Sequence, residues 1–169
     1  GTFFLTGFGV FCLQHSLVIG VIWMSIFRQK IHISAQDIDR QGRVNNVCYV
    51  QWMQDLATAH TADKGWDMAR YEKLAQGWVV RRHSVVYKRP ALLGEDIVAA
   101  TWIASFASRQ CIRRYRFVRE SDDAVLVEAE TQWVYIDLTS GRPVRIPDEL
   151  KAVFECIADD NGDKNFLLA

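Results

Sequence analysis

The chain has 169 residues, with 20 Lys and Arg side chains against 20 Asp and Glu, and 50% of its residues are hydrophobic. This length is typical of one domain and is enough to enclose a core without a disulfide or metal. The zero net charge argues against a general nucleic-acid binder. The charged fraction of 24% and the aromatic fraction of 12% exclude a disordered chain.

Charge is distributed unevenly along the chain. Residues 81–119 carry nine basic and two acidic side chains, whereas residues 120–169 carry four basic and twelve acidic ones. Two interpretations stay open with equal weight. The basic segment either binds a small phosphorylated ligand or forms a face that is paired with the acidic C-terminal third.

The cysteines are scattered, with no C-x-x-C pair and no histidine at ligand spacing. They are Cys12, Cys48, Cys111 and Cys156. This pattern is typical of reduced thiols in a cytoplasmic protein, so we expect neither a metal site nor a disulfide framework. We also expect no cofactor.

Residues 1–27 contain no charged side chain, and their length and apolarity would allow a membrane span. No basic region precedes them, which argues against a secretory signal. Gln14, His15 and several glycines argue against an anchor, and Met24 opens a stretch that is typical of a cytosolic start. We expect a non-native or extended leader that packs on the domain or on a neighbouring copy, with an anchor as the less favoured alternative.

In chain order, the weak alternation over 29–38 predicts a strand, which is followed by a polar turn. Apolar residues then recur every three or four positions up to Lys64. This predicts a long helix whose N-cap is Asn45 or Asn46 and which is stopped by Gly65. The apolar stripe is too wide for a surface helix, so we expect most of the helix to be buried.

After a short charged segment over 67–73 the sequence period changes to two, which predicts strands. Four such runs occupy 79–88, 97–106, 110–119 and 125–136. Their short connections imply an antiparallel sheet. Pro147 and the two acids after it predict a closing helix, with proline at its first position.

The most informative stretch joins two carboxylates, Asp37 and Asp39, to a turn at Gly42 and to the first turn of the long helix. The start of a helix presents unpaired N–H groups and a partial positive charge, which can stabilise an oxyanion. A carboxylate just upstream can act as a nucleophile or general base. The alternative is that both acids only cap the helix and bond to the turn.

This stretch resembles the signature of the hotdog-fold thioesterases, D-x-D-x-x-G-H-V-N-N-x-x-Y, except that Arg43 replaces the histidine. That family includes hydroxybenzoyl-CoA thioesterase, the bacterial acyl-CoA thioesterases and the plant acyl-ACP thioesterases. The resemblance implies an α+β fold in which an antiparallel sheet of about five strands wraps around one long central helix. We expect a leader over 1–27, a hotdog domain over 28–157 and a polar tail over 158–169.

The resemblance implies hydrolysis of an acyl-CoA thioester to the free acid and CoA. In it, Asp39 matches the catalytic carboxylate, as nucleophile or general base, and Asn46 matches the residue whose backbone N–H polarises the thioester carbonyl. Substrate contacts are expected from Gly42, Val44, Asn45, Tyr49, Arg81, Lys88, Arg89 and Arg109. Arg82 and Arg113 are further candidates for the CoA phosphates, whereas His60 and His83 are expected to be packing residues.

The resemblance also implies at least a homodimer, and in many members a tetramer, with the site between chains. Three other functions stay open beside acyl-CoA hydrolysis. An acyl-ACP thioesterase is the nearest of them, and a non-catalytic acyl-CoA-binding module comes from another class. A hotdog dehydratase is disfavoured because those enzymes normally use a histidine where this chain has Arg43. Gln54 stands where many members have an acid, so the role of a helix acid stays open.

Overall fold

A computed structural model describes residues 26–158 of the chain. All but the first residue of the expected tail and all but the last two residues of the expected leader lie outside this range. In the described part, no helix is long and apolar enough to cross a membrane. The elements are β1 (Phe27–His32), a 3₁₀ turn η1 (Ala35–Asp37), α2 (Asn46–Asp63), α3 (Met68–Leu74), β2 (Gln76–Tyr87), β3 (Asp96–Phe106), β4 (Gln110–Arg119), β5 (Val125–Asp137) and α4 (Asp148–Ala152).

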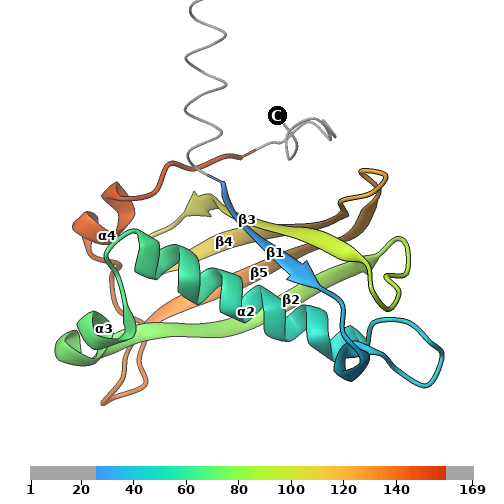
Figure 1. The fold of residues 1–169 in the computed structure, drawn as a ribbon. Coiled ribbons are helices and arrows are strands. Elements are labelled where there is room, and N and C mark those ends of the chain that lie inside the picture. The colour runs from blue at the N-terminus through green and yellow to red at the C-terminus, as the bar shows by residue number, and fades with distance from the viewer. Residues whose placement is uncertain (1–25, 159–169) are drawn as a thin grey trace, which may run out of the picture.

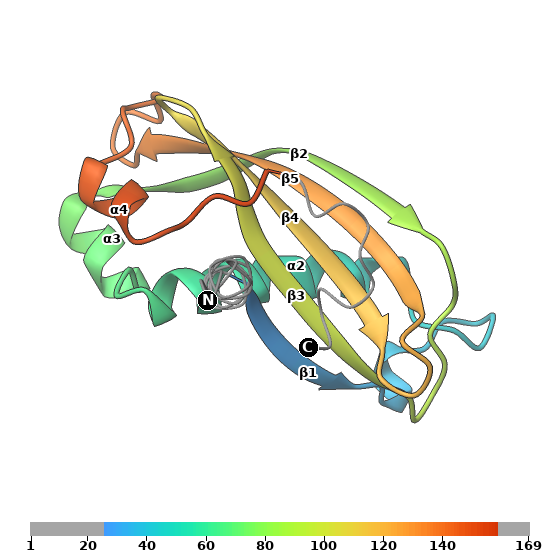
Figure 2. The ribbon, with the colours of Figure 1, turned by 90° about the horizontal axis from the view of Figure 1, so that it is seen from above.

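The five strands form one antiparallel sheet in the order β1-β3-β4-β5-β2. Figure 1 shows α2 lying across one face of this sheet, and Figure 2 shows from above how the strands curve around the helix. The predicted α+β architecture, with about five strands around one long helix, is therefore confirmed. The edge strands are β1 and β2, each of which pairs with a single neighbour in the described part of the chain.

The long helix begins and ends where its capping residues predict. The side chain of Asn45 accepts a hydrogen bond from the Val47 N–H, so Asn45 is the N-cap. Gly65 follows the last turn with a φ of +80°, a conformation that glycine adopts without strain. Only one stripe of the helix is buried, and Val47 is 69% exposed. The expectation that most of α2 is buried is therefore wrong for the single chain, because the sheet covers one side of the helix only.

The cap gives a direct test of this helix start. Asn45→Ala should lower the free energy of unfolding by about 1 kcal/mol, because the Val47 N–H loses its acceptor. Urea unfolding followed by circular dichroism measures this loss. Asn46→Ala is the matched control, since the Asn46 side chain is exposed and the substitution keeps its backbone N–H. An equal loss in the two variants would contradict the assignment of the cap.

Three parts of the chain differ from their predicted form. The charged segment after Gly65 is the helix α3, in which the Asp67 side chain caps the Arg70 N–H at 2.9 Å and Tyr71 is buried. Because α3 has only seven residues and only one of them is buried, its sequence shows no helical repeat of apolar positions. The first strand covers Phe27–His32 rather than 29–38, because the chain then turns into η1. At the closing helix, Pro147 is the N-cap rather than the first helical residue.

Candidate active site

The loop between η1 and α2 carries the predicted catalytic carboxylate. Ile38 and Val44 form an isolated antiparallel bridge, and the Asp39 N–H donates to the Arg43 carbonyl at 2.8 Å, so the loop folds back as a narrow hairpin. Gly42 closes this hairpin with a φ of +77°, which other residues adopt only with strain. The predicted glycine turn is therefore a structural requirement of the loop.

Both ends of the hairpin are tied to their surroundings. The Asn45 N–H donates to the Asp37 carbonyl at 2.8 Å, and the Val44 N–H donates to the Ala91 carbonyl at 3.0 Å. Asp39 is thereby held in the loop that leads directly into α2, at the lower right in Figure 1. The N–H groups of the first turn of α2, including that of Asn46, have no acceptor within the helix and carry a partial positive charge.

The two acids of the motif are used differently. Asp37 is committed to the fold, because its Oδ2 accepts hydrogen bonds from the Ser34 N–H at 2.9 Å and the Ser34 hydroxyl at 2.8 Å. Asp39 is half-buried, and its Oδ1 accepts from the N–H groups of Gln41 at 2.7 Å and Arg43 at 3.4 Å. Its Oδ2 accepts no hydrogen bond from residues 26–158. One carboxylate oxygen of Asp39 therefore stabilises the loop, as expected if the acid bonds to the turn. The other oxygen is available to contact a substrate or a water molecule.

Val44 and Tyr49 lie in the core beneath this loop rather than on an open surface. The Tyr49 ring packs edge-on against Tyr87 and Phe117, and burial raises the pKa of Tyr49 to about 12. Its hydroxyl therefore stays protonated at neutral pH and cannot serve as a base. The Tyr87 hydroxyl donates to the Asn46 carbonyl at 3.4 Å, which links the end of β2 to the start of α2.

The four basic residues predicted to contact substrate do not come together. Lys88 and Arg89 follow β2, and both N–H groups donate to the Leu126 carbonyl at the end of the sheet that carries Asp39. Arg81 is exposed in the middle of β2. Arg109 lies in the β3–β4 turn, at the opposite end of the sheet. Within one chain, only Lys88 and Arg89 are therefore close to the loop that carries Asp39.

Several cations of the basic segment are paired with β5 on the outer face of the sheet. Arg114 lies 3.4 Å from Glu130, Arg116 lies 3.3 Å from Glu128, and Lys88 also pairs with Glu128. These cross-strand pairs support the second interpretation of the charge pattern, a basic face matched by the acidic C-terminal third.

His60 and His83 pack against neighbouring side chains, as expected. His83 Nδ1 lies 2.8 Å from the Thr131 hydroxyl, and His60 is 2% exposed beside Arg113. Burial, with Arg113 as a second cause, lowers the pKa of His60 to about 3, so this ring is neutral and serves as an acceptor. Of the described cysteines, Cys48 is half-buried, and its pKa is raised mainly by desolvation, which makes it a poor nucleophile.

Neither of two cavities in the part of the chain that the structure describes is lined by Asp39 or Asn46. One lies on the outer face of the sheet and contains Arg114, Arg116, Glu128 and Glu130. The other lies under the far end of α2 and was not predicted from the sequence. Their positions depend on strand pairing and on α3, which local patterns do not reveal.

A family profile for the acyl-ACP thioesterase N-terminal domain matches residues 24–154. The acyl-CoA thioester hydrolase YbgC of Escherichia coli O6:H1 is 25% identical over 139 residues, which cover 78% of this chain and 97% of that protein. Slr0204, a 1,4-dihydroxy-2-naphthoyl-CoA thioesterase from Synechocystis, superposes with a TM-score of 0.70 at 15% identity, over 76% of this chain and 94% of that one.

A protein from Staphylococcus aureus, SAV2348, determined in complex with CoA, superposes with a TM-score of 0.71 at 14% identity. The match covers 76% of this chain and 80% of that one, and at this identity it shows a common fold. The profile match extends from before β1 to beyond α4, so it includes every described element. The chain therefore belongs to the acyl-ACP thioesterase N-terminal domain family, has the hotdog fold, and is a thioester hydrolase.

Proposed function

We propose that the chain hydrolyses an acyl-CoA thioester to the free acid and CoA, with Asp39 as its catalytic carboxylate. The observation that carries this proposal is the free Oδ2 of Asp39, in a hairpin tied to the start of α2. Family membership and the relative named as an acyl-CoA thioester hydrolase support the substrate class.

The chemistry can follow either of two routes. The Asp39 carboxylate attacks the thioester carbonyl carbon, forms a mixed anhydride and expels the CoA thiolate, and water then cleaves the anhydride. Alternatively, Asp39 takes a proton from a water molecule that attacks the same carbon. In both routes negative charge develops on the carbonyl oxygen, where the backbone N–H of Asn46 and the helix dipole would stabilise it.

We also propose that the enzyme works in the cytoplasm as a homodimer or a dimer of dimers, with Lys88 and Arg89 near the CoA phosphates. Exposed apolar side chains along the free edge strand β2 support a partner there: Val79 is 40% exposed and Val86 is 54% exposed. A partner chain would also explain how Arg109, remote from Asp39 in its own chain, could reach a site between chains.

Release of free thiol from a panel of straight-chain and aromatic acyl-CoA esters tests the proposed activity. Steady-state turnover of at least one ester is the expected result. Tight binding of these esters without any thiol release would contradict the proposal and favour the non-catalytic binding module.

An acyl-ACP substrate is the second candidate, because the matching family profile is that of acyl-ACP thioesterases. Exposed Arg40, Arg43 and Arg89 lie on or beside the Asp39 loop and could receive an acidic carrier protein. The same acyl group should be offered on CoA and on carrier protein at rising salt. Faster turnover of the carrier-protein ester, with a steep fall in rate as salt screens the contact, would favour this candidate over CoA.

A further inference from the structure

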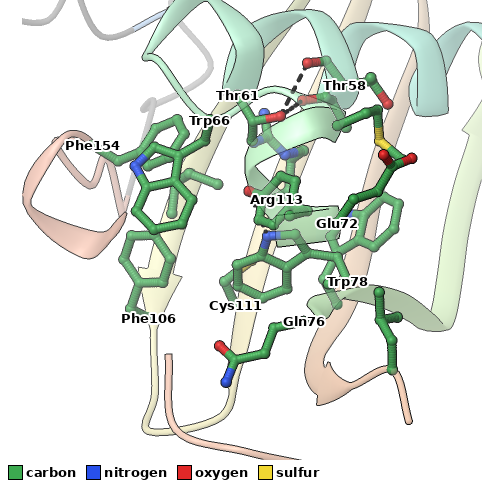
Figure 3. A pocket seen from close by; sticks show the side chains of 17 residues that line it. Thr58, Thr61, Trp66, Glu72, Gln76, Trp78, Phe106, Cys111, Arg113 and Phe154 are labelled. Carbon is green, nitrogen blue, oxygen red and sulfur yellow. Dashed lines mark hydrogen bonds between the residues drawn. The ribbon is translucent and has the colours of Figure 1, made fainter. Parts of the chain in front are cut away.

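A cavity of about 200 Å³ lies under the C-terminal half of α2, at the opposite end of that helix from Asn46. Its walls come from α2, α3, the start of β2 and the adjacent ends of β3, β4 and β5, together with the segments that follow α2, β5 and α4. Aromatic rings make up much of the lining, namely those of Trp66, Tyr71, Trp78, Phe106, Trp133 and Phe154. Figure 3 shows Trp66, Phe106 and Phe154 on one side of this cavity and Trp78 on the other.

One charged residue lies deep in this apolar wall. Arg113 on β4 is only 3% exposed and lines the cavity. Its Nη1 lies 3.0 Å from His60 Nδ1 and 3.1 Å from the Thr101 hydroxyl, which are both neutral acceptors. The Thr101 hydroxyl donates its own hydrogen to the Arg114 carbonyl at 3.0 Å, so its oxygen is free to accept.

The rest of the guanidinium has no partner in the described part of the chain. Its Nε and Nη2 groups have no hydrogen-bond acceptor, and no carboxylate of residues 26–158 forms an ion pair with it. Glu72 lines the same cavity but is exposed at its rim. The Phe154 ring centroid, 5.9 Å from Cζ, offers a weak cation–π contact only.

A buried charge without a counter-ion is unfavourable, because the interior does not replace the water that it loses. The free edge of Arg113 presents two parallel N–H groups, on Nε and Nη2, at the spacing that a carboxylate accepts in bidentate fashion. The surrounding rings would exclude water and pack against an apolar body. The charge of Arg113, the geometry of its free edge and the apolar lining of the cavity therefore all favour a ligand that has a carboxylate and an apolar body.

We propose that this cavity binds an organic carboxylate, whose oxygens accept from the Nε–Nη2 edge of Arg113 while its apolar body packs between Trp66, Trp78 and Phe154. The ligand is either a free acid from solution or a carboxylate at the far end of a bound acyl group. This inference goes beyond the proposed function, because binding of a free acid requires no hydrolysis and no contact with Asp39.

Calorimetric titration with octanoate and 2-naphthoate, each paired with its uncharged amide, tests the site at neutral pH. Each acid should bind at least about tenfold more tightly than its amide, because charge-assisted hydrogen bonds are stronger than neutral ones. Equal affinity of acid and amide, or no binding of either acid, would overturn the proposal.

Arg113→Met keeps the volume of the side chain and removes its charge, so it should abolish the preference for the acid while leaving the amide affinity nearly unchanged. Thr58→Trp is the second variant: Thr58 is exposed at the rim, so a large ring there should block both ligands without disturbing the core. If Arg113→Met fails to fold, undiminished acid binding by Thr58→Trp still overturns the proposal.

Asp39→Asn separates this site from the proposed catalytic loop, and it should bind both acids as the unchanged protein does. Loss of acid binding in that variant would overturn the inference. Kinetics then identify the source of the carboxylate. A higher kcat/KM for acyl-CoA esters with a terminal carboxylate, lost in Arg113→Met, would show that the acyl group carries it. Acid binding without such a kinetic preference would identify a free acid.

Discussion

Asp39→Asn is expected to abolish nearly all thioester hydrolysis while leaving the fold intact. The variant loses the carboxylate that would attack the carbonyl or take the proton from water. A positioned general base alone contributes about 10²–10⁴-fold to rate, so kcat should fall by at least this factor. The Asn amide oxygen can still accept from the N–H groups of Gln41 and Arg43, which hold the hairpin. Thiol release under saturating ester measures the loss, and thermal unfolding checks that the variant is folded.

Asp55→Asn is the matched control for this experiment. Asp55 is an exposed acid on α2 whose carboxylate accepts from the Gln51 side chain at 2.9 Å, and it lies next to Gln54, where many members of the family have an acid. We expect kcat to stay within about twofold, since Asp55 is two turns of helix from the loop. A fully active Asp39→Asn protein would refute the catalytic assignment. A large loss of kcat in Asp55→Asn would instead indicate that this acid on α2 takes part in catalysis.

The sheet could be predicted from the sequence because its signal is repeated and local. Residues 110–119 alternate so that Cys111, Arg113, Tyr115 and Phe117 share the face that packs under α2, and all four are buried. The start of α2 was equally predictable, because the Asn45 cap and the residues it serves are adjacent in the chain. The helix α3 has neither repetition nor length, and only its Asp67 cap could have indicated it.

The candidate site likewise combines residues that are adjacent in the sequence with residues that only the fold brings together. Asp39, Gly42 and Asn46 lie within eight residues, so one stretch of sequence places them together. Which cations share their end of the sheet depends on strand pairing, and sequence alone could not separate Lys88 and Arg89 from Arg109. The cavity beside Arg113 depends on contacts among six elements, namely α2, α3, β2, β3, β4 and β5. The sequence did contain its signal, an arginine at an inward position of an otherwise apolar strand face.

Acid should destabilise the fold well above the pH at which its carboxylates titrate, and His60 should be the main cause. Burial first, then Arg113, lowers the pKa of His60 to about 3, whereas an unfolded histidine titrates near 6.5. Between these values the unfolded chain binds a proton that the folded chain does not. The free energy of unfolding therefore falls as the pH is lowered through this window, by about 2 kcal/mol between pH 7 and pH 5.

Urea unfolding at pH 7, 6 and 5 separates the histidines from Asp122 and Asp137, whose lowered pKa values act only at more acidic pH. Burial also lowers the pKa of His83, so this histidine contributes in the same window as His60. His60→Gln should flatten the dependence, since glutamine offers Arg113 an acceptor but has no titrating group. His83→Gln is the matched control, and it should keep most of the slope because His83 is only half-buried on the exposed edge strand. A slope that survives in His60→Gln would mean that His60 can accept a proton in the folded protein. The ring would then no longer be a neutral partner of Arg113, and the guanidinium would face a second positive charge in the same apolar wall.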